Sequence, residues 1–229
     1  MLTQTITEMN RTRNTLLIFA LAIMWSCQGP SGERAVTGEA GTADATFDDY
    51  ELYLADTESS NVEWIGARPA SQHDGIVTLK EGHLRVSDGE IVGGEFVIDM
   101  ENIVVLDITD PGRNARLKAH LESDDFFDVP NYPEAKFEIT RVVKAGEGSG
   151  DYSHTITGNL TMRGTTRSVT FNAMIDVDDE QVKAKSVQFL IDRTEWGVNF
   201  QSPTVYAELV DRFIIDDIAL VVNLETRKN

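Results

Sequence analysis

The sequence predicts an all-β protein with a single folded domain, an antiparallel barrel or sandwich that contains one short helix. In the central stretch, residues 156–177, apolar side chains repeat every second residue on both sides of a polar turn at 163–166 that contains a glycine. This period is typical of strands with one buried face, joined here as a hairpin. Similar stretches recur from residue 47 onward and only one stretch resembles a helix, so we expect eight or nine strands in one domain.

The clearest strand before this hairpin covers residues 90–101, where apolar and acidic side chains alternate. The consecutive glycines Gly93 and Gly94 would let this strand bend, as a sheet that closes on itself requires. The other expected strands cover residues 50–54, 61–67, 73–86, 135–145, 182–192 and 213–226.

The one expected helix covers residues 110–122. Asp110 can accept a hydrogen bond as its N-cap, Pro111 suits the first helical position, and β-branched residues are few. Its cations form a positively charged cluster in an acidic chain. Either they lie on a solvated helix face, or the helix is a lid that places them near the polar head of a ligand. These cations are Arg113, Arg116 and Lys118.

The first 27 residues resemble an export signal. Arg11 and Arg13 precede an uncharged, mostly apolar run at 15–25, which is too short to span a bilayer but suits the h-region of a secretory signal. Cys27 follows directly, after a small serine, as in a bacterial lipobox, so we expect its thiol to be acylated; the alternative is an incidental cysteine. The predicted location is therefore the periplasmic side of a bacterial membrane, as a lipoprotein.

The next segment, residues 28–46, has the composition of a flexible linker. Glycine, alanine, serine, threonine and charged residues replace the apolar pattern there. The folded domain is therefore expected to cover residues 47–229, held near the membrane by the linker and by the acyl chains on Cys27.

Charge and cysteine content exclude several classes of function. The chain has 20 Lys and Arg against 38 Asp and Glu, a formal charge of -18, which repels phosphate backbones and makes nucleic acid a poor partner. The single cysteine excludes an intramolecular disulfide and a zinc site built on several thiolates.

We find no sequence signature of a metal site, a cofactor site or a catalytic site. The four histidines lack metal-binding spacing, and the chain has no nucleophile elbow, phosphate-binding loop or dinucleotide fingerprint. The acidic stretch 176–180 could suggest calcium, but it lacks spaced oxygen ligands and a central glycine, so a solvated hairpin tip is the better interpretation. We therefore expect that the protein is not an enzyme.

Three motifs resemble those of the YceI-like, polyisoprenoid-binding family. Residues 120–128 are similar to its H-L-x-S-x-D-F-F-D motif, followed by Y-P-x-A-x-F at 132–137. Residues 158–167 resemble its G-x-L-T-x-[RK]-G-x-T-[RK] motif, and residues 193–197 resemble R-[ST]-x-[FW]-G. The motifs occur in the family's order, and the resemblance extends from residue 50 to about residue 224. It implies an eight-stranded, lipocalin-like antiparallel barrel around an apolar tunnel that holds an isoprenoid chain.

The function that this resemblance implies is a carrier or storage protein for an isoprenoid or similar amphiphilic lipid. A hydrolase or isomerase acting on such a lipid, and a structural surface domain with a filled core, remain alternatives. A homodimer is also left open.

Two groups of residues are candidates for ligand contact. The first group is either tunnel lining or ordinary core, and the second either contacts the ligand head or pairs with surface carboxylates. His120, within a motif, is expected to pack or to hydrogen-bond between helix and loop. The lining candidates are Phe126, Phe127, Phe137, Phe171, Ala173, Phe189 and Trp196. The head-group candidates are Arg113, Arg116, Lys118, Arg163 and Arg193.

Overall fold

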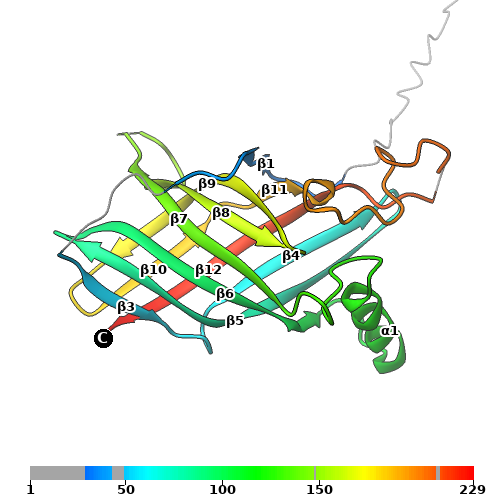
Figure 1. Cartoon of the computed structure of the whole chain (residues 1–229), viewed down its shortest axis with the longest axis horizontal. Coiled ribbons are helices and arrows are strands. Elements are labelled where there is room, and N and C mark those ends of the chain that lie inside the picture. The colour runs from blue at the N-terminus through cyan, green and yellow to red at the C-terminus, as the bar shows by residue number, and fades with distance from the viewer. Residues whose placement is uncertain (1–28, 43–48, 147, 210–211) are drawn as a thin grey trace, which may run out of the picture.

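Eight antiparallel strands form a closed ring in the computed structural model of the chain, which describes residues 29–42, 49–146, 148–209 and 212–229 (Figure 1). The last strand, β12, pairs with β3 and so closes the ring. The all-β prediction is confirmed, and the closure selects the barrel over the sandwich. The ring strands are β3 (Glu51–Ala55), β5 (Ser71–Ser87), β6 (Glu90–Val105), β7 (Glu134–Lys144), β8 (His154–Met162), β9 (Thr165–Val177), β10 (Gln181–Ser186) and β12 (Asp217–Lys228).

Two further strands extend the wall of this barrel. β4 (Asn61–Arg68) follows β3 and pairs with β5 on one side and β12 on the other. β11 (Phe189–Asp192) follows β10 and also pairs with β12. The predicted signal segment, Cys27 and the predicted start of the domain at residue 47 lie outside the described residues.

The central hairpin is confirmed, with a shorter turn than expected. Met162 of β8 pairs with Thr165 of β9, so only Arg163 and Gly164 form the turn. Both have positive φ angles, 49° and 73°, as a two-residue hairpin turn of the primed type requires. The alternation in β9 places Val169 and Ala173 in the interior.

The expected strand 182–192 is interrupted because its second half leaves β9. The pairing of β10 with β9 ends at Ser186, and the amide of Val187 then donates to the carbonyl of Asn172 over 2.9 Å. β11 pairs instead with β1 (Glu33–Arg34) in parallel. The final strand also begins later than expected, at Asp217, because the carbonyls just before it accept hydrogen bonds from an arginine side chain.

Residues 29–42 pack into the barrel wall, so the expected flexible linker is corrected for this segment. β1 lies beside β11, and β2 (Val36–Gly38) pairs antiparallel with β9, so the two fill the space that β11 leaves. Ala35 between them is buried, and its amide donates to the carbonyl of Leu190 over 2.8 Å. The physical reason is that open strand edges need hydrogen-bond partners, which this segment supplies.

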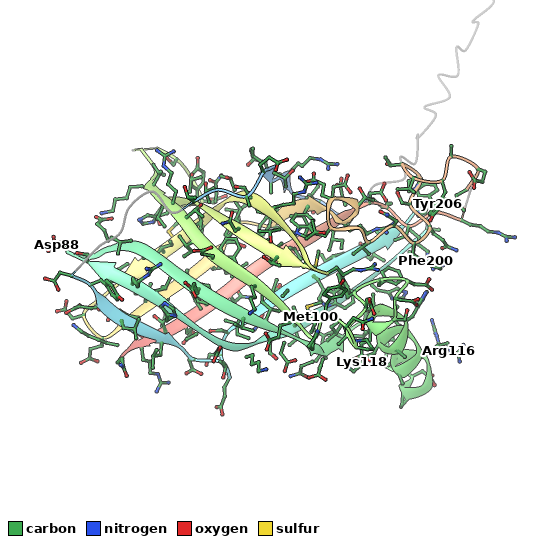
Figure 2. The ribbon with its side chains drawn as sticks, viewed as in Figure 1. Asp88, Met100, Arg116, Lys118, Phe200 and Tyr206 are labelled. Atoms are coloured by element: carbon green, nitrogen blue, oxygen red, sulfur yellow. The ribbon has the colours of Figure 1, made fainter. Side chains whose placement is uncertain are left out.

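The expected helix is confirmed as α1 (Pro111–Glu122). The Asp110 side chain accepts a hydrogen bond of 2.8 Å from the amide of Arg113, which makes it the N-cap. α1 lies at one end of the barrel, and the turn at Asp88 lies at the opposite end (Figure 2). Among the described residues, no helix is long and apolar enough to cross a membrane.

Candidate functional site

The barrel encloses two apolar cavities that lie end to end. Their volumes are about 130 and 150 Å³. The first cavity is lined by residues near the β5–β6 turn, such as Leu84 and Ile91, and the second by residues near α1, such as Leu121. The cavities are adjacent, because four residues line both of them. These shared residues are Val62, Ile98, Leu160 and Leu220.

The walls of both cavities are almost wholly hydrophobic. The first has one polar side chain, Ser186, whose hydroxyl already accepts a hydrogen bond of 2.8 Å from the amide of Val222. The second has two, Trp64 and Arg193. Because water in a cavity needs several polar partners, such walls favour an apolar occupant over solvent.

Six of the seven predicted lining residues lie on these walls. Phe137, Phe171, Ala173 and Phe189 line the first cavity, where the rings of Phe171 and Phe189 are stacked with centroids 4.5 Å apart. Their contact with a ligand stays a prediction. Phe126 and Phe127 line the second cavity.

Trp196 lines neither cavity, so the prediction for this residue is corrected. Its side chain is only 1% exposed, and its Nε1 donates to the carbonyl of Leu160 over 3.0 Å. η1 (Arg193–Trp196) places it there by turning the chain away from β11. Trp196 therefore fixes η1 to the outer part of β8 through a satisfied hydrogen bond.

The motifs that carry the family resemblance meet at one end of the barrel. Arg163, in the hairpin turn, donates to the carbonyl of Phe126 over 2.7 Å and to that of Gly197 over 3.2 Å. The His120 ring contacts the rings of Phe126 and Phe200 edge to face, each with centroids 4.9 Å apart. His120 also lies 3.0 Å from a carboxylate oxygen of Asp125, which matches the role expected for it. We call this end the cap; Phe200 marks it in Figure 2.

Arg193 is a buried structural residue of the cap. It is 1% exposed and donates to the carbonyls of Val198, Ile214 and Ile215 over 2.5, 3.0 and 3.4 Å. Asp216 lies 3.2 Å away as an ion pair, in a geometry that does not make a hydrogen bond. Burial lowers the pKa of Arg193 and the Asp216 carboxylate opposes that shift. All three guanidinium nitrogens are therefore already bonded within the cap.

The other predicted head-group residues do not gather at one place. Lys118 donates to the carbonyl of Glu101 over 2.9 Å and pairs with Glu122, which attaches α1 to β6. Arg113 and Arg116 are exposed on α1, and neither lines a cavity (Figure 2). Their role at a ligand head stays a prediction, but the geometry does not bring the five cations together.

Sequence reasoning missed Trp64 as a residue of the cavity wall. Its Nε1 is buried and has no hydrogen-bond partner in the described part of the chain. A Cβ on Gly75 would lie 1.9 Å from the Val104 carbonyl and 2.5 Å from the Trp64 ring, so the glycine makes room for the indole. The sequence did contain a signal for this position: a tryptophan in one short expected strand and a glycine in the expected strand that follows it. These two strands, β4 and β5, are neighbours in the sheet (Figure 1), and Trp64 pairs with Gly75.

His154 is a buried histidine in β8. Its Nδ1 lies 2.8 Å from the hydroxyl of Ser153, and burial lowers its pKa, opposed by the nearby Glu90 carboxylate. In the described ranges, no group of three or more histidine, cysteine or acidic residues could hold a metal ion.

Comparisons with known proteins place this fold and these motifs in one family. The family model described as a YceI-like domain matches residues 53–226. A UPF0312 protein of Pseudomonas putida is 48% identical over 60 residues, 26% of this chain and 29% of that protein. A UPF0312 protein of Vibrio parahaemolyticus is 39% identical over 87 residues, 35% of this chain and 44% of that protein. The match thus spans less than half the length of each of these curated relatives.

Two solved structures share the fold at low sequence identity. The crystal structure of Burkholderia cenocepacia BcnA matches with a TM-score of 0.58 and 16% identity, covering 75% of this chain and 98% of BcnA. A polyisoprenoid-binding domain from Saccharophagus degradans matches with a TM-score of 0.52 and 11% identity, covering 79% of this chain and all of that domain. From the family model that matches most of the barrel, together with this shared fold, it follows that the chain belongs to the YceI-like domain family.

Proposed function

We propose that this protein binds one isoprenoid or a similarly chain-shaped amphiphilic lipid along its two cavities, and that it carries or stores this lipid on the periplasmic side of a bacterial membrane. The observation that supports this most strongly is the pair of adjacent apolar cavities inside a closed barrel. Family membership and the polyisoprenoid-binding description of one structural neighbour agree with it.

The energetics of burial suit a lipid chain. An isoprene unit buries roughly 100 Å² of apolar surface, which contributes about 2.5 kcal/mol at ~25 cal/mol per Å². A few units therefore supply the affinity without any polar contact. The polar end of the lipid then determines which lipid is selected.

The chemistry of the cavity walls favours a carrier over a hydrolase or isomerase. Such an enzyme needs a general acid or base that faces its substrate. The polar side chains that line the cavities in the described residues are Ser186, Trp64 and Arg193, and none is a carboxylate, a histidine or a nucleophile beside a base. The cavities also disfavour the third alternative, a surface domain with a filled core.

Export and anchoring through Cys27 complete the proposal. An acyl group on Cys27 would hold the domain at the bilayer. Cys27→Ser is expected to move the full-length protein from the membrane fraction to the soluble fraction. Unchanged partitioning would contradict the anchor.

Native mass spectrometry of the purified full chain tests the lipid directly. We expect a species heavier than the bare chain by one lipid, and extraction followed by fragmentation should give an isoprenoid pattern. Refolding from denaturant without lipid provides the control, because it should remove the added mass. Recovery of only the bare chain, with no uptake when farnesol is added, would refute the proposed function.

A further inference from the structure

One seam of the barrel wall is closed by residues 29–42, which we call the strap. Elsewhere in the described ring, each strand pairs directly with the next one. The pairing of β9 with β10 ends at Ser186, and from there the strap lies between β9 and β11 (Figure 1). Among the described residues, β1 pairs only with β11 and β2 only with β9. Each part of the strap is therefore paired with the wall along one edge.

The strap is held to the barrel by few buried contacts. Pro30 and Ala35 are its only buried residues, and both side chains are small. Arg34 pairs with Asp217 over 2.7 Å, but the arginine side chain is 58% exposed, and an exposed ion pair contributes about 0–1 kcal/mol. Segments that bury little apolar surface open at a lower free energy than the rest of a fold. The strap is therefore the part of the wall that opens most easily.

A hollow of about 150 Å³ lies between β1 and β9 and reaches the wall of the first cavity. Strap residues such as Val36 and β9 residues such as Thr170 line it. Phe171 and Phe189, whose rings are stacked, line both this hollow and the first cavity. A strand needs about 4.8 Å on each side, so the seam without its strap is about twice that wide, which is enough for a hydrocarbon chain.

We propose that the strap is a side gate, which detaches from β9 and lets the lipid chain enter and leave the first cavity between β9 and β11. This inference rests on the proposed function and adds the route to the site. Opening here breaks the three residue pairs between β2 and β9. Opening the seam between β8 and β9 would break nine.

Asn159 of β8 is the latch of this gate. Its side-chain oxygen accepts from the amide of Gly41 over 2.9 Å, and its side-chain nitrogen donates to the carbonyl of Gly41 over 2.8 Å. Gly41 follows β2, so these two bonds fasten the strap across β9 to β8. The next residue, Leu160, lines both cavities, so Asn159 projects from the outer face of β8. Asn159 lines neither cavity and affects lipid exchange through the strap.

A reversible disulfide tests the gate in the full-length protein. Val36→Cys with Thr170→Cys places two thiols at directly opposed positions of β2 and β9, and Cys27→Ser removes the native thiol. After loading with farnesol, mixing with an apolar fluorescent dye reports farnesol release. Oxidation should slow release by about tenfold or more, because the strap can no longer leave β9, and dithiothreitol should restore the rate.

A matched disulfide controls for rigidity of the same hairpin. Thr161→Cys with Thr166→Cys joins opposed positions of β8 and β9 beyond the pairing of the strap. Its oxidation should leave the release rate unchanged.

Loosening the latch gives a second measurement that needs no disulfide. Asn159→Ala should speed both uptake and release by at least about fivefold, the effect of one net hydrogen bond. The Kd for farnesol should stay unchanged, because a gate alters both rates equally. Thr161→Val removes a hydrogen bond of 2.8 Å to Thr166 on the same outer face, and should change neither rate.

The outcomes distinguish this inference from the proposed function. Equal release from the oxidised and reduced strap disulfide, or unchanged rates in Asn159→Ala, would overturn the side gate and direct the route to an end of the barrel, while the lipid site stands. Failure of farnesol to bind the unmodified protein would overturn both.

Discussion

Filling the first cavity at Ala173 should weaken lipid binding strongly with little loss of stability. Ala173 lies in β9, is 3% exposed and lines the cavity, whose volume is about 130 Å³. An apolar cavity of roughly 150 Å³ in another protein holds a benzene molecule, so the phenyl ring of Ala173→Phe can enter this space. The usual cost of overpacking, about 1–3 kcal/mol, should therefore be largely avoided.

The effect on binding follows from the apolar surface that the ring displaces. Excluding one isoprene unit, roughly 100 Å², removes about 2.5 kcal/mol, which weakens binding by about sixtyfold. A stability loss below about 1 kcal/mol corresponds to less than about 4 °C in a domain of this size. Displacement of an apolar fluorescent dye by farnesol measures the change in binding, and thermal unfolding measures the change in stability.

The neighbouring residue provides a matched control. Met174 is 47% exposed and follows Ala173 on the opposite face of β9, so Met174→Phe should leave both binding and stability unchanged. Undiminished binding in Ala173→Phe, or equal loss in both variants, would refute the assignment of the first cavity as the site of the chain. Unfolding of Ala173→Phe alone would show that the position is close-packed core.

Further predictions concern the cap, the barrel wall and pH. Arg193→Met should lower the free energy of unfolding in urea by about 3–5 kcal/mol, because Asp216 is left buried without its cation, and adding Asp216→Leu should recover part of this. Equal loss in the single and double variants would contradict the ion pair. Burial lowers the pKa of His154 below its ordinary value of 6.5, so protonation disfavours the folded state; stability should be constant above pH 6.5 and fall as pH drops toward the lower folded pKa. His154→Gln should flatten that dependence, and an unchanged profile would contradict it. Deleting residues 1–46 should leave a β-rich circular-dichroism spectrum but lower the melting temperature, because β1 and β2 no longer cover the wall; an unchanged melting temperature would show that this segment contributes nothing.

Features with a local physical cause could be predicted from the sequence. The strands around the central hairpin follow from a period of two, and α1 follows from an aspartate cap and a proline at its start. The hairpin turn at Arg163 and Gly164 follows from turn chemistry. Inward-facing residues such as Phe171 could be identified because alternation fixes which face each side chain occupies.

Features that depend on distant partners could not be predicted in this way. The composition of residues 29–42 indicates a linker, but the segment pairs with strand edges that β11 leaves open, far along the chain. From the sequence, Arg193 resembles a surface cation. Its burial depends on the Ile214 carbonyl and the Asp216 carboxylate, which follow more than twenty residues later in the chain. Trp64 resembles an ordinary core residue, because the missing acceptor of its indole is visible only in three dimensions.

A crystal structure of the purified full chain after incubation with farnesol tests the central claim most directly. We predict density for the chain in the two adjacent cavities, passing Leu160 and Leu220, which line both. Empty cavities at saturating ligand, or density bound only on the outer face of the barrel, would contradict the account.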